Sequence, residues 1–185
     1  SSWNDAFSGL QEALAVSSRG DTIRVAAGLY YPSALTDPQN PRSATFLLKD
    51  QVTLLGGYPP DGGGSDSARN PIAHPTILTG DIGVPLDQTD NAFHVLTAEQ
   101  IAPETLIDGF HIESGRADGS NTSYYENKGG GLLLIEGFPT IRNCIFRGNH
   151  ATSSGGEGGS LYAMKSSARL VNCRFLDNEA GTGGA

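Results

Sequence analysis

One segment of this chain occurs twice, with a period of 29, and this repeat constrains the fold more than any other feature. The first copy, residues 129–151, reads GGGLLLIEGFPTIRNCIFRGNHA, and the second, residues 158–180, reads GGSLYAMKSSARLVNCRFLDNEA without a gap. A fixed period of this size indicates stacked units. Each unit has the alternation and turn residues of β-strands and no room for two helices, so the stack is predicted to be a coil of short strands.

The repeat also predicts which side chains face inward. In the segment LVNCRF, residues 170–175, strict alternation places Val171, Cys173 and Phe175 on one face, and we expect this face to be the inner one. Coils one strand spacing apart, about 4.8 Å, stack equivalent residues into ladders. The expected structural ladders are Cys144 with Cys173, Phe146 with Phe175, and, at the following corner, Asn149 with Asn178.

The two cysteines allow three interpretations. A buried ladder of small apolar side chains is favoured, because Cys is among the most buried residue types. A disulfide between Cys144 and Cys173 is also allowed, since one strand spacing lies within the Cα separation that a disulfide tolerates. A metal or redox role is disfavoured, because two cysteines separated by a full repeat period match no ligand spacing. The sequence alone leaves the disulfide undecided.

A third, degenerate copy precedes the repeat. The segment IDGFHIESGRA, residues 107–117, aligns on the first copy with an offset of 34, which pairs Ile112 with Phe146 and Gly115 with Asn149. The five residues beyond the period of 29 must bulge outward. The polar segment Ser120–Glu126 is where we expect this insertion, because it lacks periodicity and precedes a glycine run.

Composition excludes several classes of function. The chain has 185 residues, 25 of them glycine, which suits short strands and many corners. A net charge of −8 argues against nucleic acids and anionic membranes, which need a basic surface. No apolar run approaches the roughly 20 residues of a membrane span. No cofactor is predicted, because no motif calls for one.

The first residues form the one predicted helix. In WNDAFSGLQEALAV, residues 3–16, Phe7, Leu10 and Leu14 recur at helical spacing, Trp3 extends the pattern, and Asn4 or Asp5 is a possible N-cap. We expect residues 1–20 to cap the apolar end of a β-solenoid that fills residues 21–185. The chain stops at GTGGA where another coil would start, so we expect a longer parent protein and an open end that self-associates.

Ten strands are predicted, which correspond to about five coils. They are Thr22–Ala26, Ala44–Leu48, Val52–Leu55, Thr76–Leu78, Ala92–Leu96, Thr105–Ile112, Leu132–Ile135, Ile141–Phe146, Leu161–Met164 and Leu170–Phe175. Three stretches are predicted loops: Tyr31–Arg42, Pro59–Pro75 and Gly83–Asn91. Long loops on a rigid scaffold are where binding usually occurs.

With the repeats in place, the chain resembles a known family. Phe146–Asn149 and Phe175–Asn178 match the FxxN motif, and Gly183–Ala185 the GGA motif, of the chlamydial polymorphic outer-membrane-protein repeat. Upstream, segments such as GDTIRVAAGLYYP and LIDGFHIESG resemble bacterial secreted right-handed parallel β-helix proteins. The resemblance covers nearly the whole chain and implies an all-β, right-handed parallel β-helix that is extracellular or on the bacterial cell surface.

Two functions from different classes are compatible with this resemblance. The favoured one is a non-catalytic segment with a structural or adhesive role and a glycan or a host surface as partner. The alternative is a fragment of a polysaccharide lyase or glycoside hydrolase. Such an enzyme needs carboxylates grouped on one outer face, and a glycosidase pair about 5–10 Å apart. The available carboxylates are Asp81, Asp108, Glu113 and Asp118.

The favoured binding residues lie in the insertion. Tyr124 and Tyr125 can stack on sugar rings while Glu126 and Asn127 bond hydroxyl groups, although a tyrosine that packs on the coil wall is the simpler alternative. No metal site is predicted. The loops Asp118–Thr122 and Asp61–Asp66 lack a full set of calcium ligands, and the four histidines have no metal-binding spacing; they are His74, His94, His111 and His150.

Overall fold

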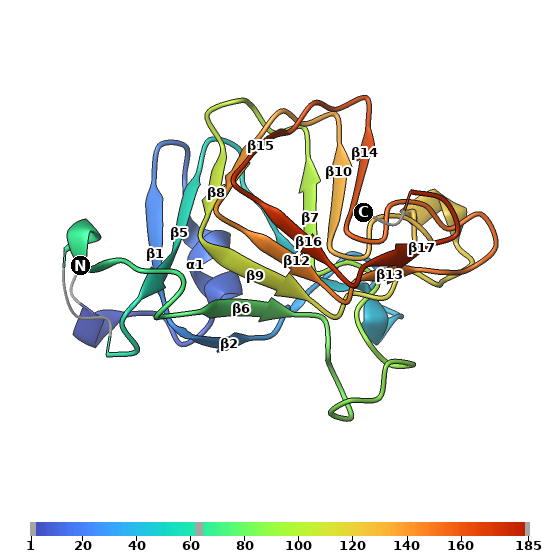
Figure 1. Cartoon of the computed structure of the whole chain (residues 1–185), viewed down its shortest axis with the longest axis horizontal. Helices are drawn as coiled ribbons and strands as arrows, with labels where there is room; N and C mark the ends of the chain where they lie inside the picture. Colours follow the sequence, from blue (N-terminus) through green and yellow to red (C-terminus); the bar gives the residue numbers. More distant parts are fainter. Residues whose placement is uncertain (1–2, 62–64, 184–185) are drawn as a thin grey trace.

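Parallel β-strands predominate in the computed structural model, which describes residues 3–61 and 65–183 (Figure 1). Three sheets have five strands each, and all of their pairings are parallel except that between β3 and β4. A fourth, two-stranded sheet pairs β13 with β17. The fold is therefore mostly β, with three largely parallel sheets and one α-helix among the described residues.

The first sheet has the order β1 (Thr22–Ala26), β5 (Thr53–Tyr58), β8 (Leu106–Asp108), β11 (Thr140–Arg142), β15 (Arg169–Val171). The second is β3 (Ala34–Leu35), β4 (Ala44–Leu47), β7 (Leu96–Glu99), β10 (Leu132–Ile135), β14 (Leu161–Met164). The third is β2 (Gly28–Tyr30), β6 (Thr76–Thr79), β9 (Phe110–Glu113), β12 (Ile145–Arg147), β16 (Arg174–Leu176). The remaining elements are β13 (His150–Ala151), β17 (Glu179–Ala180), α1 (Leu10–Val16) and four 3₁₀ turns, η1 (Trp3–Asp5), η2 (Pro41–Ser43), η3 (Asp66–Ala68) and η4 (Thr122–Tyr124).

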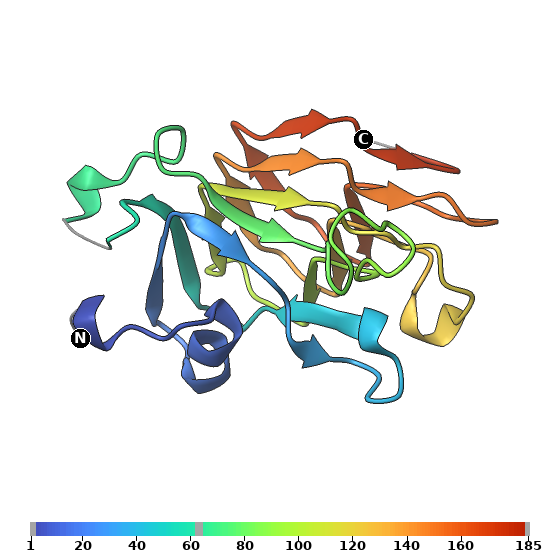
Figure 2. The same cartoon turned by 90° about the horizontal axis from the view of Figure 1, so that it is seen from below.

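From β4 onward the chain visits the second, first and third sheets in the same order in every round. The sequence repeat has the period of the last rounds. Leu132 pairs with Leu161, Ile141 with Leu170 and Phe146 with Phe175, and the members of each pair lie one period apart. Figure 2 shows the strands of these rounds lying side by side in successive layers. The sequence repeat therefore sets the register of all three sheets in this part of the chain.

The degenerate copy pairs as the offset of 34 predicts. Ile112 is the register partner of Phe146, and Arg116 forms a bridge with His150. Beyond the insertion the offset returns to 29, because Lys128 forms a bridge with Glu157. The five extra residues therefore lie between Arg116 and Lys128, as predicted.

Three of the predicted strands each contain a corner, which interrupts the expected alternation of inward and outward side chains. Gly109, Asn143 and Asn172 have φ of +84°, +52° and +52°, in the left-handed region, and each divides one predicted strand into two strands of different sheets. After each corner, the alternation of inward and outward side chains starts anew. Val171, predicted to point inward, is the register partner of the exposed Arg142, so that prediction was wrong.

Downstream of these corners, the side chains of adjacent strands stack on one another. The rings of Phe146 and Phe175 are stacked with centroids 5.2 Å apart and an interplanar angle of 10°. The Asn149 amide donates to Oδ1 of Asn178 at 3.0 Å and to the carbonyl of Ile112 at 2.9 Å. Cys144 and Cys173 are both free thiols, Cys144 buried and Cys173 half-buried. These contacts join adjacent coils through side chains as well as backbone.

The N-terminal segment differs from its prediction. Leu10 and Leu14 of α1 join the hydrophobic core, but the helix begins only at Leu10, after Gly9, and neither Asn4 nor Asp5 caps it. Trp3 instead lies in η1 and contacts the Tyr58 ring at 5.5 Å between centroids. The spacing of apolar residues overestimated the helix because Phe7 is exposed rather than packed.

Two further details concern element limits and membranes. The strand predicted at Ala92–Leu96 lies later, at Leu96–Glu99, although Ala92–Leu96 is buried throughout. Gly184 and Ala185 of the GGA motif lie outside the described residues, as does part of the predicted loop Pro59–Pro75. Among the described residues, no helix is long and apolar enough to cross a membrane.

Candidate functional site

The insertion between Arg116 and Lys128 lies beside the outer face of the second sheet. Leu132 and Leu134 of β10 point into the core, so by alternation Leu133 and its register partner Tyr162 point outward. Leu133 is nevertheless only 4% exposed. The outer face of the sheet is therefore covered at this position, and the insertion reaches the same face beside it at Tyr162 and Met164.

Tyr125 is the residue that contacts this outer face. It ends η4 with φ of +54°, a left-handed conformation that turns the chain back. Its hydroxyl donates to Sδ of Met164 at 3.3 Å, and its ring lies 6.5 Å from the ring of Tyr162, tilted by 32°. Both tyrosines are half-buried, so part of each residue is open to solvent.

A charged pair lies beside these rings. Nζ of Lys128 is 2.5 Å from Oε1 of Glu157 and 5.5 Å from the centroid of the Tyr162 ring. The same Nζ donates to the carbonyl of Gly155 at 3.0 Å. We call Tyr125, Tyr162, Lys128 and Glu157 together the tyrosine surface. It combines apolar ring faces with a donor and an acceptor, which is what a sugar ring requires.

The four predicted binding residues differ in exposure: Tyr124 is exposed, Tyr125 is half-buried, and Glu126 and Asn127 are buried. Tyr124 is exposed at the end of η4, next to Tyr125 of the tyrosine surface. Glu126 and Asn127 are buried, at 7% and 9% exposure, and hold the insertion in shape. Glu126 accepts from the backbone N–H of Asn121 at 3.0 Å, and the Asn127 amide donates to the carbonyl of Gly155 at 3.2 Å. The two buried side chains are therefore poorly placed to bond a ligand.

Sequence reasoning missed Tyr162, Lys128 and Glu157. The repeat alignment places Tyr162 opposite Leu133, at an outward position between two core positions. An aromatic residue where the other copy has a leucine was the available signal. Lys128 and Glu157 are separated by one repeat period, so their pairing also follows from the repeat.

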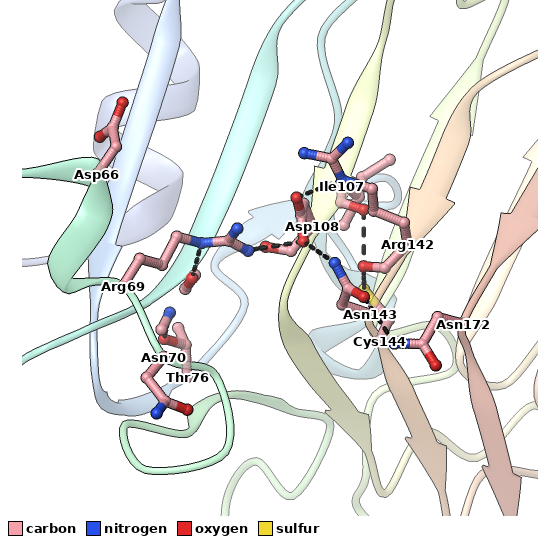
Figure 3. A network of polar contacts seen from close by, with 12 residues as sticks. Asp66, Arg69, Asn70, Thr76, Ile107, Asp108, Arg142, Asn143, Cys144 and Asn172 are labelled. Carbon is pink, nitrogen blue, oxygen red and sulfur yellow. Dashed lines mark hydrogen bonds and ion pairs between the residues drawn. The ribbon is translucent and has the colours of Figure 1, made fainter.

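Asp108, at the end of β8 in the first sheet, is the centre of a polar network (Figure 3). Its buried carboxylate accepts from Nη2 of Arg69 at 2.7 Å, from Nε of Arg142 at 2.5 Å and from the Asn143 amide at 2.9 Å. The Asn172 amide extends the network by donating to Oδ1 of Asn143 at 2.8 Å. Burial raises the pKa of Asp108, but the donors from Arg69, Asn143 and Arg142 outweigh it, so the net shift is downward.

Asp118 has a comparable environment among the loops. It accepts from Arg42 at 2.6 Å and from Arg116 at 2.7 Å. Burial raises its pKa, but these two guanidinium groups lower it by more. Arg116 also donates to Gln88, so this cluster joins the loop at residues 83–91 to the loop at residues 31–42 and to the start of the insertion.

The other two candidate carboxylates, those of Asp81 and Glu113, bond groups outside these two arginine clusters. Both carboxylate oxygens of Asp81 accept from the backbone N–H of Leu86 at 3.1 Å. Glu113 contacts Nδ1 of His111 at 3.3 Å. Each of the four carboxylates is therefore held by donors of its own rather than by a second carboxylate.

The remaining candidates are the histidines and the possible metal ligands. His94 is buried, and its Nδ1 lies 3.1 Å from the carbonyl of Gly129 at the end of the insertion. Burial lowers the pKa of His94 to about 4, so its ring is neutral at physiological pH. In the part of the chain that the structure describes, no group of three or more His, Cys, Asp or Glu side chains is arranged to hold a metal ion.

Comparison with family models, curated proteins and solved structures finds no match to this chain.

Proposed function

We propose that this chain is a segment of a right-handed parallel β-helix of about five coils, with a non-catalytic, adhesive role, that binds glycans at the tyrosine surface. The order in which the chain visits its three sheets supports the β-helix, since each round returns to the strand beside the one it left. Residues 1–20 would then cover the first coil, where Leu10 and Leu14 reach the core.

The observation that carries the binding proposal is the pairing of two half-buried tyrosine rings with an ion pair. The ring centroids of Tyr125 and Tyr162 lie 6.5 Å apart, Nζ of Lys128 lies 5.5 Å from the centroid of the Tyr162 ring, and Glu157 pairs with Lys128. Aromatic faces bind the apolar face of a sugar ring, and the charged groups bond its hydroxyl groups. Both tyrosines are held before any ligand arrives, Tyr125 by its bond to Met164, which keeps the entropy cost of binding low.

The compartment follows from the resemblance to the chlamydial polymorphic outer-membrane-protein repeat. Secretion or display at a bacterial cell surface places the tyrosine surface where it meets glycans of a host or of a matrix. The free thiols Cys144 and Cys173 are compatible with this compartment, because both lie against the core rather than in solution.

The enzymatic alternative receives less support from the carboxylates. A general acid in a glycosidase needs a raised pKa, whereas the pKa values of Asp108 and Asp118 are lowered. Each of these two carboxylates accepts from two arginine side chains, which stabilise its charged form. Both therefore suit a structural ion pair better than proton transfer.

A glycan array with the folded chain tests the proposal, followed by titration of the strongest hit. The variant Tyr162→Ala is expected to weaken binding at least tenfold, which corresponds to about 1.4 kcal/mol, because one ring face is lost. The control is Tyr31→Ala, which removes an exposed tyrosine from another loop. No binding to any glycan, or equal loss in both variants, would contradict the proposal.

A further inference from the structure

The unpaired edge of β1 differs from the rest of the first sheet. β1 lies at the end of the strand order, and β5 is the one described strand that pairs with it. The carbonyl of Asp21 accepts from Thr53 and the N–H of Ala27 donates to Tyr58, so residues of odd number bond β5. By the alternation of a strand, the N–H and C=O groups of Thr22 and Arg24 point away from β5.

A groove of about 530 Å³ runs along this free edge. One wall is β1, all five residues of which line the groove. Successive side chains of a strand point to opposite faces, so lining by all five places the groove along the edge of β1 rather than over one face. The other wall is the segment from Trp3 to Ser17, with apolar contacts from Trp3, Phe7, Leu10 and Val16.

The shape of the groove fits an extended chain. A strand that adds to a sheet edge bonds through its backbone, while pockets beside the edge receive alternate side chains. Here the backbone groups of Thr22 and Arg24 supply the first requirement. The apolar wall, including Phe7 at 55% exposure and Val16 at 66%, supplies the second.

The charge of the groove selects among extended chains. Its lining includes Asp21, and the one arginine among the described lining residues, Arg24, is bound by Asp66 through two hydrogen bonds of 2.7 and 3.1 Å. The balance is negative, as is the whole chain at −8. A basic partner is therefore attracted, and an acidic one is repelled.

We propose that this groove binds an extended segment of another polypeptide, alternating apolar and polar residues with basic flanks, as an added strand on β1. In Figure 1 this edge and the insertion lie at opposite ends of the molecule. Peptide binding is therefore independent of glycan binding at the tyrosine surface, and either can fail without the other.

A synthetic nine-residue peptide of alternating valine and threonine with a lysine at each end tests the proposal. We expect it to shift the backbone amide resonances of Thr22–Ala26 in ¹⁵N-labelled protein. The same peptide N-methylated at alternate residues, in each of the two phases, should bind at least tenfold more weakly in one phase, because it loses the donors that face β1. A version with glutamate ends should bind more weakly at low salt than at high salt.

Variants of the protein separate backbone pairing from side-chain contact. Thr22→Pro removes an outward N–H at the first residue of an edge strand, where proline is tolerated, and is expected to abolish binding. Thr22→Ala keeps that N–H and is expected to bind as wild type does. Binding that neither methylation phase weakens would overturn strand addition. No binding of the lysine peptide, or shifts at Thr22–Ala26 that grow with protein concentration without peptide, would overturn the proposed occupant, the latter in favour of a second copy of the chain.

Discussion

The two copies of the repeat have matching sequences but different surroundings. Phe146 and Cys144 are fully buried, whereas Phe175 and Cys173 are half-buried. Phe146 lies between register partners on both sides, Ile112 and Phe175, while Phe175 has a described partner on one side. The repeat therefore determines where a side chain lies in its sheet, and the adjacent strands determine how much it contributes to stability.

The largest expected difference between the copies is at the phenylalanine ladder. Phe146→Ala is expected to lower the free energy of unfolding by about 3–5 kcal/mol, because it leaves a cavity between two coils. Phe175→Ala is expected to cost about 1–2 kcal/mol, since one side of its ring is already open. Urea denaturation of both variants measures the difference. Equal losses of unfolding free energy in the two variants would contradict the account.

The asparagine ladder gives the next effect. Asn149 is fully buried and bonds the Gly115 N–H, the Ile112 carbonyl and Asn178. Asn149→Ala leaves buried groups without partners, which costs about 1–3 kcal/mol. Asn178→Ala is the matched control and should cost less, since water reaches its half-buried site. The comparison would be contradicted if Asn178→Ala proved the more damaging change.

Much of this arrangement could be predicted from the sequence, and the exceptions have physical causes. The period and the offset of 34 predicted the register and the site of the insertion, because stacked strands repeat what the sequence repeats. The corners at Asn143 and Asn172 were missed, since a left-handed asparagine inside a run of strand-forming residues interrupts an alternation that otherwise looks continuous. Tyr162 was missed because its role depends on Tyr125, which reaches it through a loop without periodicity.

The polar network at these corners predicts that the stability of the protein depends on pH in acid. Asn143 donates to the Asp108 carboxylate, whereas Asn172 donates to the neutral Asn143. Because the pKa of Asp108 is lowered in the folded state, its contribution to stability is complete above its unfolded value of about 4 and is lost as pH falls through the lower, folded value.

Unfolding free energies measured between about pH 2 and pH 7 test this dependence. Asp108→Asn should have a lower unfolding free energy than wild type at pH 7. This difference should become smaller as the pH falls. Asn172→Ala is the control and should leave the slope in acid unchanged. If the difference in unfolding free energy between wild type and Asp108→Asn did not change with pH, the charge of Asp108 would not be the cause of the stabilisation.

The smallest expected difference concerns the thiols. Burial raises the pKa of Cys144 to about 12, which suppresses its reactive thiolate, while Cys173 is half-buried. A thiol reagent added to native protein should modify Cys173 slowly and Cys144 more slowly still. Mass spectrometry of the labelled peptides distinguishes them, with urea-unfolded protein as the control in which both react. Faster labelling of Cys144 would contradict its inward position.

The central claim is that the ladders provide stability and the tyrosine surface provides binding. Its most direct test is the affinity of the strongest array glycan for two variants, Phe175→Ala and Tyr125→Ala/Tyr162→Ala, measured by calorimetric titration under conditions where both are folded. The account predicts that Phe175→Ala binds as wild type does, although it unfolds at lower urea. The double tyrosine variant should lose at least tenfold in affinity. Retained affinity in the tyrosine variant, or lost affinity in Phe175→Ala, would contradict the account.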